Sequence, residues 1–144
     1  MKPSARQCSL LELPELNPDA DIAVSMDRIV QASGLSRAEA VDRLNAAARR
    51  YGVRLASGSA RELGLATFEK WLNPREADYV PSVRALNLFC HVFGVMEPLD
   101  LLVRSHGNGW RIIGGEDVRL LEWARTEQEI KRLRARKRKI ETEL

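Results

Sequence analysis

Few side chains in this 144-residue chain have the types and spacing that catalysis requires. The two histidines, His91 and His106, lie in different segments, and neither belongs to a cluster spaced for metal ligation. Cys90 directly precedes His91, but neighbours on a helix point to different faces, so the two do not form a nucleophile and its base. The glycines near Asn108 and at 114–115 lack the strand–loop–helix frame that binds nucleotide phosphates. We therefore expect a protein that is not an enzyme and uses no metal, no cofactor and no small-molecule substrate.

The most specific pattern lies in residues 59–74, which have the sequence SARELGLATFEKWLNP. The apolar spacing predicts a short helix over residues 60–63, a tight turn at Gly64 and a second short helix over residues 67–72. The second helix is expected to end at Asn73, because a proline disfavours helical geometry in the residue before it. Two helices joined in this way are typical of proteins that place the second helix in the major groove of DNA.

Side chains on the second helix divide into an inner and an outer set. Phe68, Trp71 and Leu72 are expected to face the core, and Thr67, Glu69 and Lys70 to face outward. On that outer side Thr67 and Lys70 could touch bases or phosphates. Arg61 and Arg75 flank the helix pair, and we expect them to bind phosphates, which sets affinity rather than sequence preference. A solvated surface charge is the alternative interpretation of each of these cations.

A second candidate corner precedes this one at Gly34-Leu35-Ser36, with Leu44 ten residues after the glycine. It resembles the turn and recognition helix of winged and simple helix–turn–helix regulators, and in that arrangement Arg37 and Arg43 would contact DNA. Ordinary helical corners in an all-α protein are the third interpretation of both segments. We favour the corner at Gly64, because a short second helix suits entry by its N-terminal end into the major groove.

The remaining pattern predicts an all-α fold: a compact multi-helix domain of phage-repressor-like helix–turn–helix type followed by a long C-terminal helix. Helices are expected from Ile22 to Ser33 and from Ser36, the N-cap of a capping box with Glu39, to Tyr51. Others are expected over residues 81–92 and from Pro98, with one short strand over residues 110–113. The domains are thus a flexible N-terminal arm (1–21), a helical DNA-binding domain (22–113) and a C-terminal basic helix (116–144).

The C-terminal segment combines strong positive charge with a sparse apolar seam. Residues 119–144 carry nine Lys or Arg against five Glu, and seven of the nine residues 131–139 are basic. Trp123, Ile130, Leu133 and Ile140 recur at roughly heptad spacing, which predicts a short coiled coil that forms a dimer or tetramer. Glu141 and Glu143 could pair across chains with the basic residues. Phosphate contact by the basic tract is a compatible alternative, and a solvated helix is the third.

Bulk composition excludes several other classes of protein. Apolar residues make up 44% and charged residues 30%, which is normal for a globular domain, and the net charge is only +3. Two cysteines, Cys8 and Cys90, do not make a disulfide framework, and Cys90 is expected to be a buried free thiol. Neither a bilayer-spanning apolar stretch nor a signal-peptide pattern is evident, so we expect a cytoplasmic protein with no membrane partner.

The chain resembles the helix–turn–helix regulatory proteins of temperate phages and Mu-like prophages, in particular phage CII-type regulators. The likeness covers roughly residues 25–125. The segments that carry it are Gly34-Leu35-Ser36-Arg37, Phe68-Glu69-Lys70-Trp71-Leu72-Asn73-Pro74, Pro81-Ser82-Val83-Arg84-Ala85-Leu86, Phe89-Cys90 and Glu97-Pro98-Leu99. This resemblance implies an oligomer that binds double-stranded DNA and controls transcription. A non-enzymatic helical interaction module of phage origin, binding an acidic protein partner, is the alternative.

Overall fold

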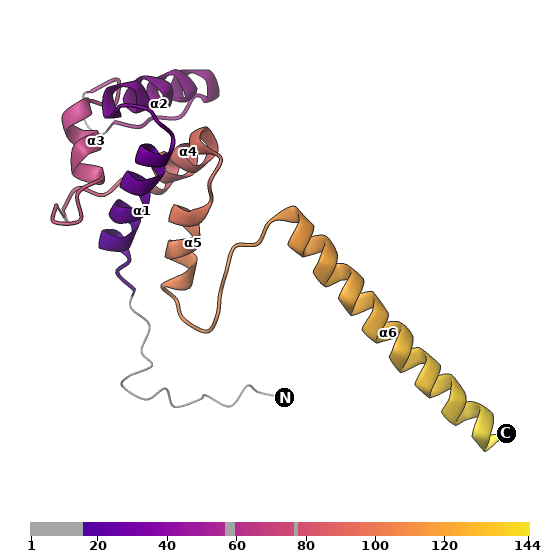
Figure 1. Ribbon diagram of the computed structural model, residues 1–144. Coiled ribbons are helices and arrows are strands. Elements are labelled where there is room, and N and C mark those ends of the chain that lie inside the picture. Colours follow the sequence, from indigo (N-terminus) through magenta and orange to yellow (C-terminus); the bar gives the residue numbers. More distant parts are fainter. Residues whose placement is uncertain (1–15, 57–59, 77) are drawn as a thin grey trace. The chain divides into compact units, whose positions relative to one another are not determined.

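The computed structural model describes residues 16–56, 60–76 and 78–144. These described residues form six helices and no strand, so the predicted all-helical fold is confirmed (Figure 1). The chain divides into two compact units, Met1–Ile112 and Ile113–Leu144. Most of the expected N-terminal arm, with Cys8, lies outside the described residues.

The first two helices are α1 (Asp19–Ala32) and α2 (Arg37–Tyr51). They run in clearly different directions (Figure 1) and are joined by a four-residue turn in which Gly34 has a φ of +74°. Residues that carry a Cβ rarely adopt this backbone conformation, so glycine is the residue that suits position 34 best. The Ser36 hydroxyl accepts a hydrogen bond from the Glu39 N–H at 3.1 Å. Ser36 is therefore the N-cap of α2, as predicted.

The third helix, α3 (Leu65–Trp71), begins directly after Gly64, and the helix predicted over residues 60–63 is wrong. Those residues form an irregular connection with bends at Arg61 and Glu62 instead. Its backbone is held by a side chain of α2 rather than by a helical turn, because Asn45 occupies both polar groups of Leu63. The segment around Gly64 is therefore not a pair of helices joined by a turn.

Two further helices complete the first unit: α4 (Val83–Phe93) and α5 (Glu97–Arg104). α4 begins later than the predicted Pro81, because the Ser82 hydroxyl caps the helix by accepting from the Ala85 N–H at 3.1 Å. The strand predicted over residues 110–113 is also wrong. In that segment the Ile112 N–H donates to a carboxylate oxygen of Asp100 at 2.6 Å instead of to a neighbouring strand.

The core of the first unit draws one large side chain from each of four helices. Met26, Leu44, Phe68 and Phe89 are completely buried, in α1, α2, α3 and α4 respectively. α1 packs on α5, α2 on both α3 and α4, and α4 on α5. Burying each of these side chains contributes about 1.5–3 kcal/mol, so the core fixes the helix that was expected to contact DNA, α3, against α2.

The second unit consists mainly of one helix, α6 (Gly115–Glu143), with 29 residues and none of them buried. Its start just after Gly114 agrees with the long C-terminal helix predicted from residue 116. Across the ranges that the structure describes, no helix is both long and apolar enough to cross a membrane.

Candidate nucleic-acid interface

Asn45 on α2 determines where the connection to α3 runs. The side-chain amide lies buried, and its Nδ2 donates to the Leu63 carbonyl while its Oδ1 accepts from the Leu63 N–H, both at 2.9 Å. One amide side chain thereby satisfies two backbone groups that would otherwise be buried without partners. The connection is consequently held alongside α2, and the start of α3 follows directly from it.

Three arginines lie beside this connection. Arg49, Arg54 and Arg61 line one open groove between the C-terminal half of α2 and the connection to α3. Among the described residues that line the groove, Glu62 supplies the one carboxylate, and it forms an ion pair with Arg49. This arginine groove therefore has an excess of positive charge, which suits phosphate groups.

Sequence reasoning identified only Arg61 in the arginine groove. Arg49 and Arg54 were missed because they belong to the end of α2 and to the loop after it, far from the helix pair that was expected. The closeness of the three arginines depends on the Asn45–Leu63 contact, and the spacing of residues along the chain carries no signal of that contact.

The outer face of α3 matches the expected division of its side chains. Phe68 and Trp71 are buried and meet edge-to-face, with ring centroids 6.3 Å apart, whereas Thr67 and Glu69 are exposed. Lys70 is only partly exposed, and its Nζ lies 3.9 Å from the centroid of the Tyr79 ring. This cation–π contact holds the ammonium group at the C-terminal end of α3.

The structure brings Lys70 close to Arg37, so the two predicted corners meet at one open groove. Both cations line it, together with Asp27, Glu69 and Glu76. Arg37 is already paired with Asp27, with 3.1 Å between the guanidinium and carboxylate atoms. Two cations against three carboxylates give this groove, unlike the arginine groove, no excess of positive charge.

The remaining predicted residues, Thr67, Arg75 and Arg43, are exposed and line neither groove. Arg75 follows α3 directly, where its backbone N–H donates to the Asn73 side chain at 3.0 Å. Arg43 lies midway along α2. Within the described part of the chain, neither Arg43 nor Arg75 has a side-chain hydrogen bond or ion pair, so both remain available to a partner.

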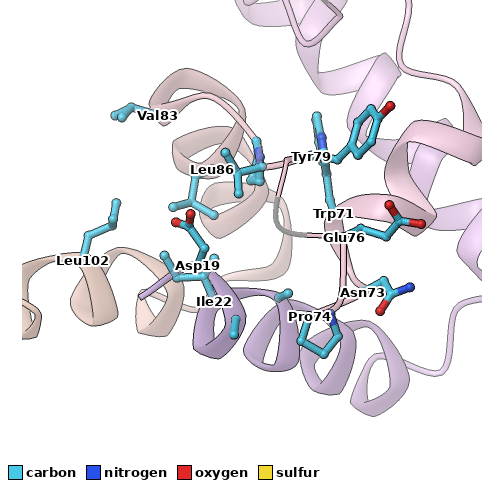
Figure 2. A pocket seen from close by; sticks show the side chains of 14 residues that line it. Asp19, Ile22, Trp71, Asn73, Pro74, Glu76, Tyr79, Val83, Leu86 and Leu102 are labelled. Carbon is cyan, nitrogen blue, oxygen red and sulfur yellow. The ribbon is translucent and has the colours of Figure 1, made fainter. Parts of the chain in front are cut away.

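An apolar pocket of about 90 Å³ lies beyond the end of α3 (Figure 2). Ile22 of α1, Trp71 of α3 and Leu86 of α4 contribute to its lining, and Tyr79 and Val83 are exposed residues at its edge. The sequence did not reveal it, because it joins side chains from four helices and the loop after α3. Its volume is below the roughly 300–1,000 Å³ of pockets that hold drug-sized ligands.

Cys90 and His91, the adjacent residues considered for catalysis, have different surroundings. Burial raises the pKa of the Cys90 thiol above its ordinary value, which disfavours the reactive thiolate. His91 instead faces Tyr51, with 3.3 Å between its Nε2 and the phenolic oxygen. Nowhere in residues 16–56, 60–76 and 78–144 do three or more His, Cys, Asp or Glu side chains gather in a way that could hold a metal ion.

Comparisons with known proteins add no further constraint on this site. No family model matches the sequence, and no curated protein or solved structure matches it either.

Proposed function

We propose that this protein is a DNA-binding transcriptional regulator of phage type, which contacts double-stranded DNA with the outer face of α3 and with the arginine groove. The observation that carries this proposal is the arginine groove, in which three arginines and, among the described lining residues, one carboxylate lie beside the connection that leads into α3. In this arrangement Arg49, Arg54 and Arg61 neutralise phosphates, which positions the protein without reading sequence. Thr67, near the start of α3, is the side chain best placed to contact bases.

The start of α2 is a weaker candidate for the DNA-contacting helix. Arg37 is engaged by Asp27, and the exposed residues that follow it include Glu39 and Asp42. Carboxylates on the outer face of a helix that approaches DNA would repel phosphates. The corner at Gly34 is a true turn between two helices, yet its charges do not suit the role.

Self-association through α6 is part of this proposal. A seven-residue helix such as α3 offers little surface, whereas a dimer addresses two half-sites at once. α6 has no buried residue, and Trp123, Leu133 and Ile140 are 63%, 57% and 51% exposed. Covering these side chains with a second copy would remove exposed apolar surface from water.

A protein-interaction module is the second candidate function, and the basic tract of α6 favours it. Seven basic side chains in residues 131–139 are all exposed, and they would suit an acidic partner protein as well as phosphate. The two functions differ in which unit binds: the regulator uses the first unit, and the interaction module uses α6.

Fluorescence anisotropy with labelled duplex DNA at a series of salt concentrations tests the proposal. We expect binding by the full chain with a log-linear loss of affinity as salt rises, and weaker but still salt-dependent binding by a chain ending at Gly115. An absence of binding by both chains at low salt would contradict a DNA site in the first unit. It would favour the interaction through α6 instead.

A further inference from the structure

The charges of α6 are divided along its length. The residues up to Glu129 include five carboxylates, at positions 116, 117, 122, 127 and 129, against Arg119 and Arg125. From Ile130 onward the helix carries seven cations against Glu141 and Glu143. The helix therefore has an acidic first half and a basic second half.

A single face of α6 carries the apolar seam. In the heptad repeat Trp123, Ile130 and Lys137 occupy one core position, and Thr126, Leu133 and Ile140 occupy the other. Ile130 is half-buried within its own helix, and the other apolar members are exposed. Nothing within the second unit covers this face.

We propose that α6 binds the α6 of a second copy in antiparallel orientation, with Ile130 packed against the partner's Leu133. This inference rests on the self-association in the proposed function and adds its orientation and register. In this register Glu127 and Glu129, at the end of the acidic half of each helix, lie beside the basic half of the other. A parallel pair would instead place the two acidic halves together and the two basic halves together, which is destabilising.

The seam fits this register at each core layer from residue 123 to residue 140. When Ile130 faces the partner's Leu133, Trp123 faces the partner's Ile140, so apolar residues meet apolar residues. Thr126 then faces the partner's Lys137, which pairs the two polar positions. In a parallel pair with the helices in register, Lys137 would face the partner's Lys137 inside the seam, and burying two like charges there is costly.

The flanking positions beside the central layers hold opposite charges in this register. Glu127 comes beside the partner's Arg134, and Glu129 comes beside the partner's Arg136; two-fold symmetry makes each pair occur twice. A parallel pair also brings opposite charges together at flanking positions. In either orientation Glu122 lies beside one carboxylate of the partner, which is an unfavourable contact. The flanking pairs therefore support the register, whereas the Lys137 layer and the divided charge of the helix favour the antiparallel orientation.

The orientation is measurable with one spin label per chain. The full chain with Cys8→Ser and Thr142→Cys carries the label at position 142, while Cys90 stays shielded because it is only 2% exposed. Antiparallel pairing separates the two labels by about 30 Å along the helix axis. Parallel pairing places them within about 20 Å of each other. A pulsed-EPR distance near the longer value supports the proposal; the shorter distance, or a monomer by sedimentation equilibrium, overturns it.

A charge-reversal series gives an independent test of the register. Glu127→Lys with Glu129→Lys should weaken self-association at least tenfold, and adding Arg134→Glu with Arg136→Glu in the same chain should restore it. Glu116→Lys with Asp117→Lys is the matched control, because those positions extend past the end of the partner helix. In a parallel pair, the first variant should cause no net loss of self-association. The two substitutions would remove one repulsive contact between the helices and create another. That result, or a failed rescue, contradicts the antiparallel register.

Measuring DNA affinity on the same variants separates this inference from the proposed function. An antiparallel dimer without DNA binding leaves the inference standing and removes the regulator. A parallel dimer that binds DNA overturns the inference and leaves the regulator standing.

Discussion

The side-chain amide of Asn45 and the backbone of Leu63 form two reciprocal hydrogen bonds, each 2.9 Å long, across eighteen residues of sequence. Through them α2 holds the connection that leads into α3. The same contact brings Arg61 to the groove that Arg49 and Arg54 line. The position of the proposed DNA-contacting surface thus depends on a buried polar contact rather than on a standard helix pair.

Replacing Asn45 by alanine should destabilise the first unit by about 2–4 kcal/mol, because it leaves the buried N–H and C=O of Leu63 without partners. Urea denaturation followed by circular dichroism measures the change. An exposed asparagine within α4 provides the matched control, and Asn87→Ala should change stability by less than about 0.5 kcal/mol. Equal effects of the two substitutions would show that the contact does not hold the connection.

Asp100 should hold the end of the first unit in a similar way. Its buried carboxylate accepts from the Ile112 N–H at 2.6 Å and pairs with Arg104 and Arg111 at 3.0 and 3.2 Å. Asp100→Ala should therefore release Ile112, and hydrogen exchange at the backbone amide of Ile112 should accelerate at least tenfold. Unchanged exchange at Ile112 would mean that other contacts protect this segment.

Glu97 and Arg28 should make stability depend on pH in acid. The hydrogen bond from Arg28 is the main cause that lowers the pKa of Glu97 below its ordinary value of 4.5. Because the folded-state pKa is depressed, this contribution is present above the unfolded-state value and is lost as pH falls through the folded-state pKa. Comparing Arg28→Gln with the unaltered chain by urea denaturation should show a stability difference at neutral pH that shrinks as the solution is acidified below pH 4.5. A difference independent of pH would exclude the ion pair as its cause.

Lys70→Ala should lower DNA affinity, since it removes a cation from the outer side of α3. Its effect on the thermal midpoint should be small, because the cation–π contact with Tyr79 contributes about 0.5–1 kcal/mol at a partly exposed site. Anisotropy and thermal unfolding on the same variant measure both effects. Unchanged affinity for Lys70→Ala together with lost binding for Arg37→Ala would assign the DNA contact to the start of α2.

The sequence predicted those parts of the fold whose signals are local. The Ser36 N-cap, the turn at Gly34 and the long C-terminal helix are all confirmed, because each depends on residues within a few positions of one another. The helix predicted over residues 60–63 and the strand over residues 110–113 are wrong. In both, a distant side chain satisfies the backbone, Asn45 in the first and Asp100 in the second.

In the candidate site, too, only the features with local signals could be predicted. The division of α3 into a buried side with Phe68 and an exposed side with Thr67 was visible in the sequence, because it follows helical spacing. Arg49 and Arg54 could not be assigned to the site, since their closeness to Arg61 depends on how the connection folds back along α2.

The most direct test of the central claim is the salt dependence of DNA affinity for the full chain carrying Arg49→Gln and Arg61→Gln. Its control is Arg119→Gln with Arg125→Gln in α6, which removes equal charge from the other unit. We predict that the arginine-groove variant loses at least tenfold in affinity and that its slope against log salt falls by about two, as expected when two phosphate contacts are removed. Equal affinity and slope for the groove variant and the unaltered chain would contradict the arginine groove as a DNA site.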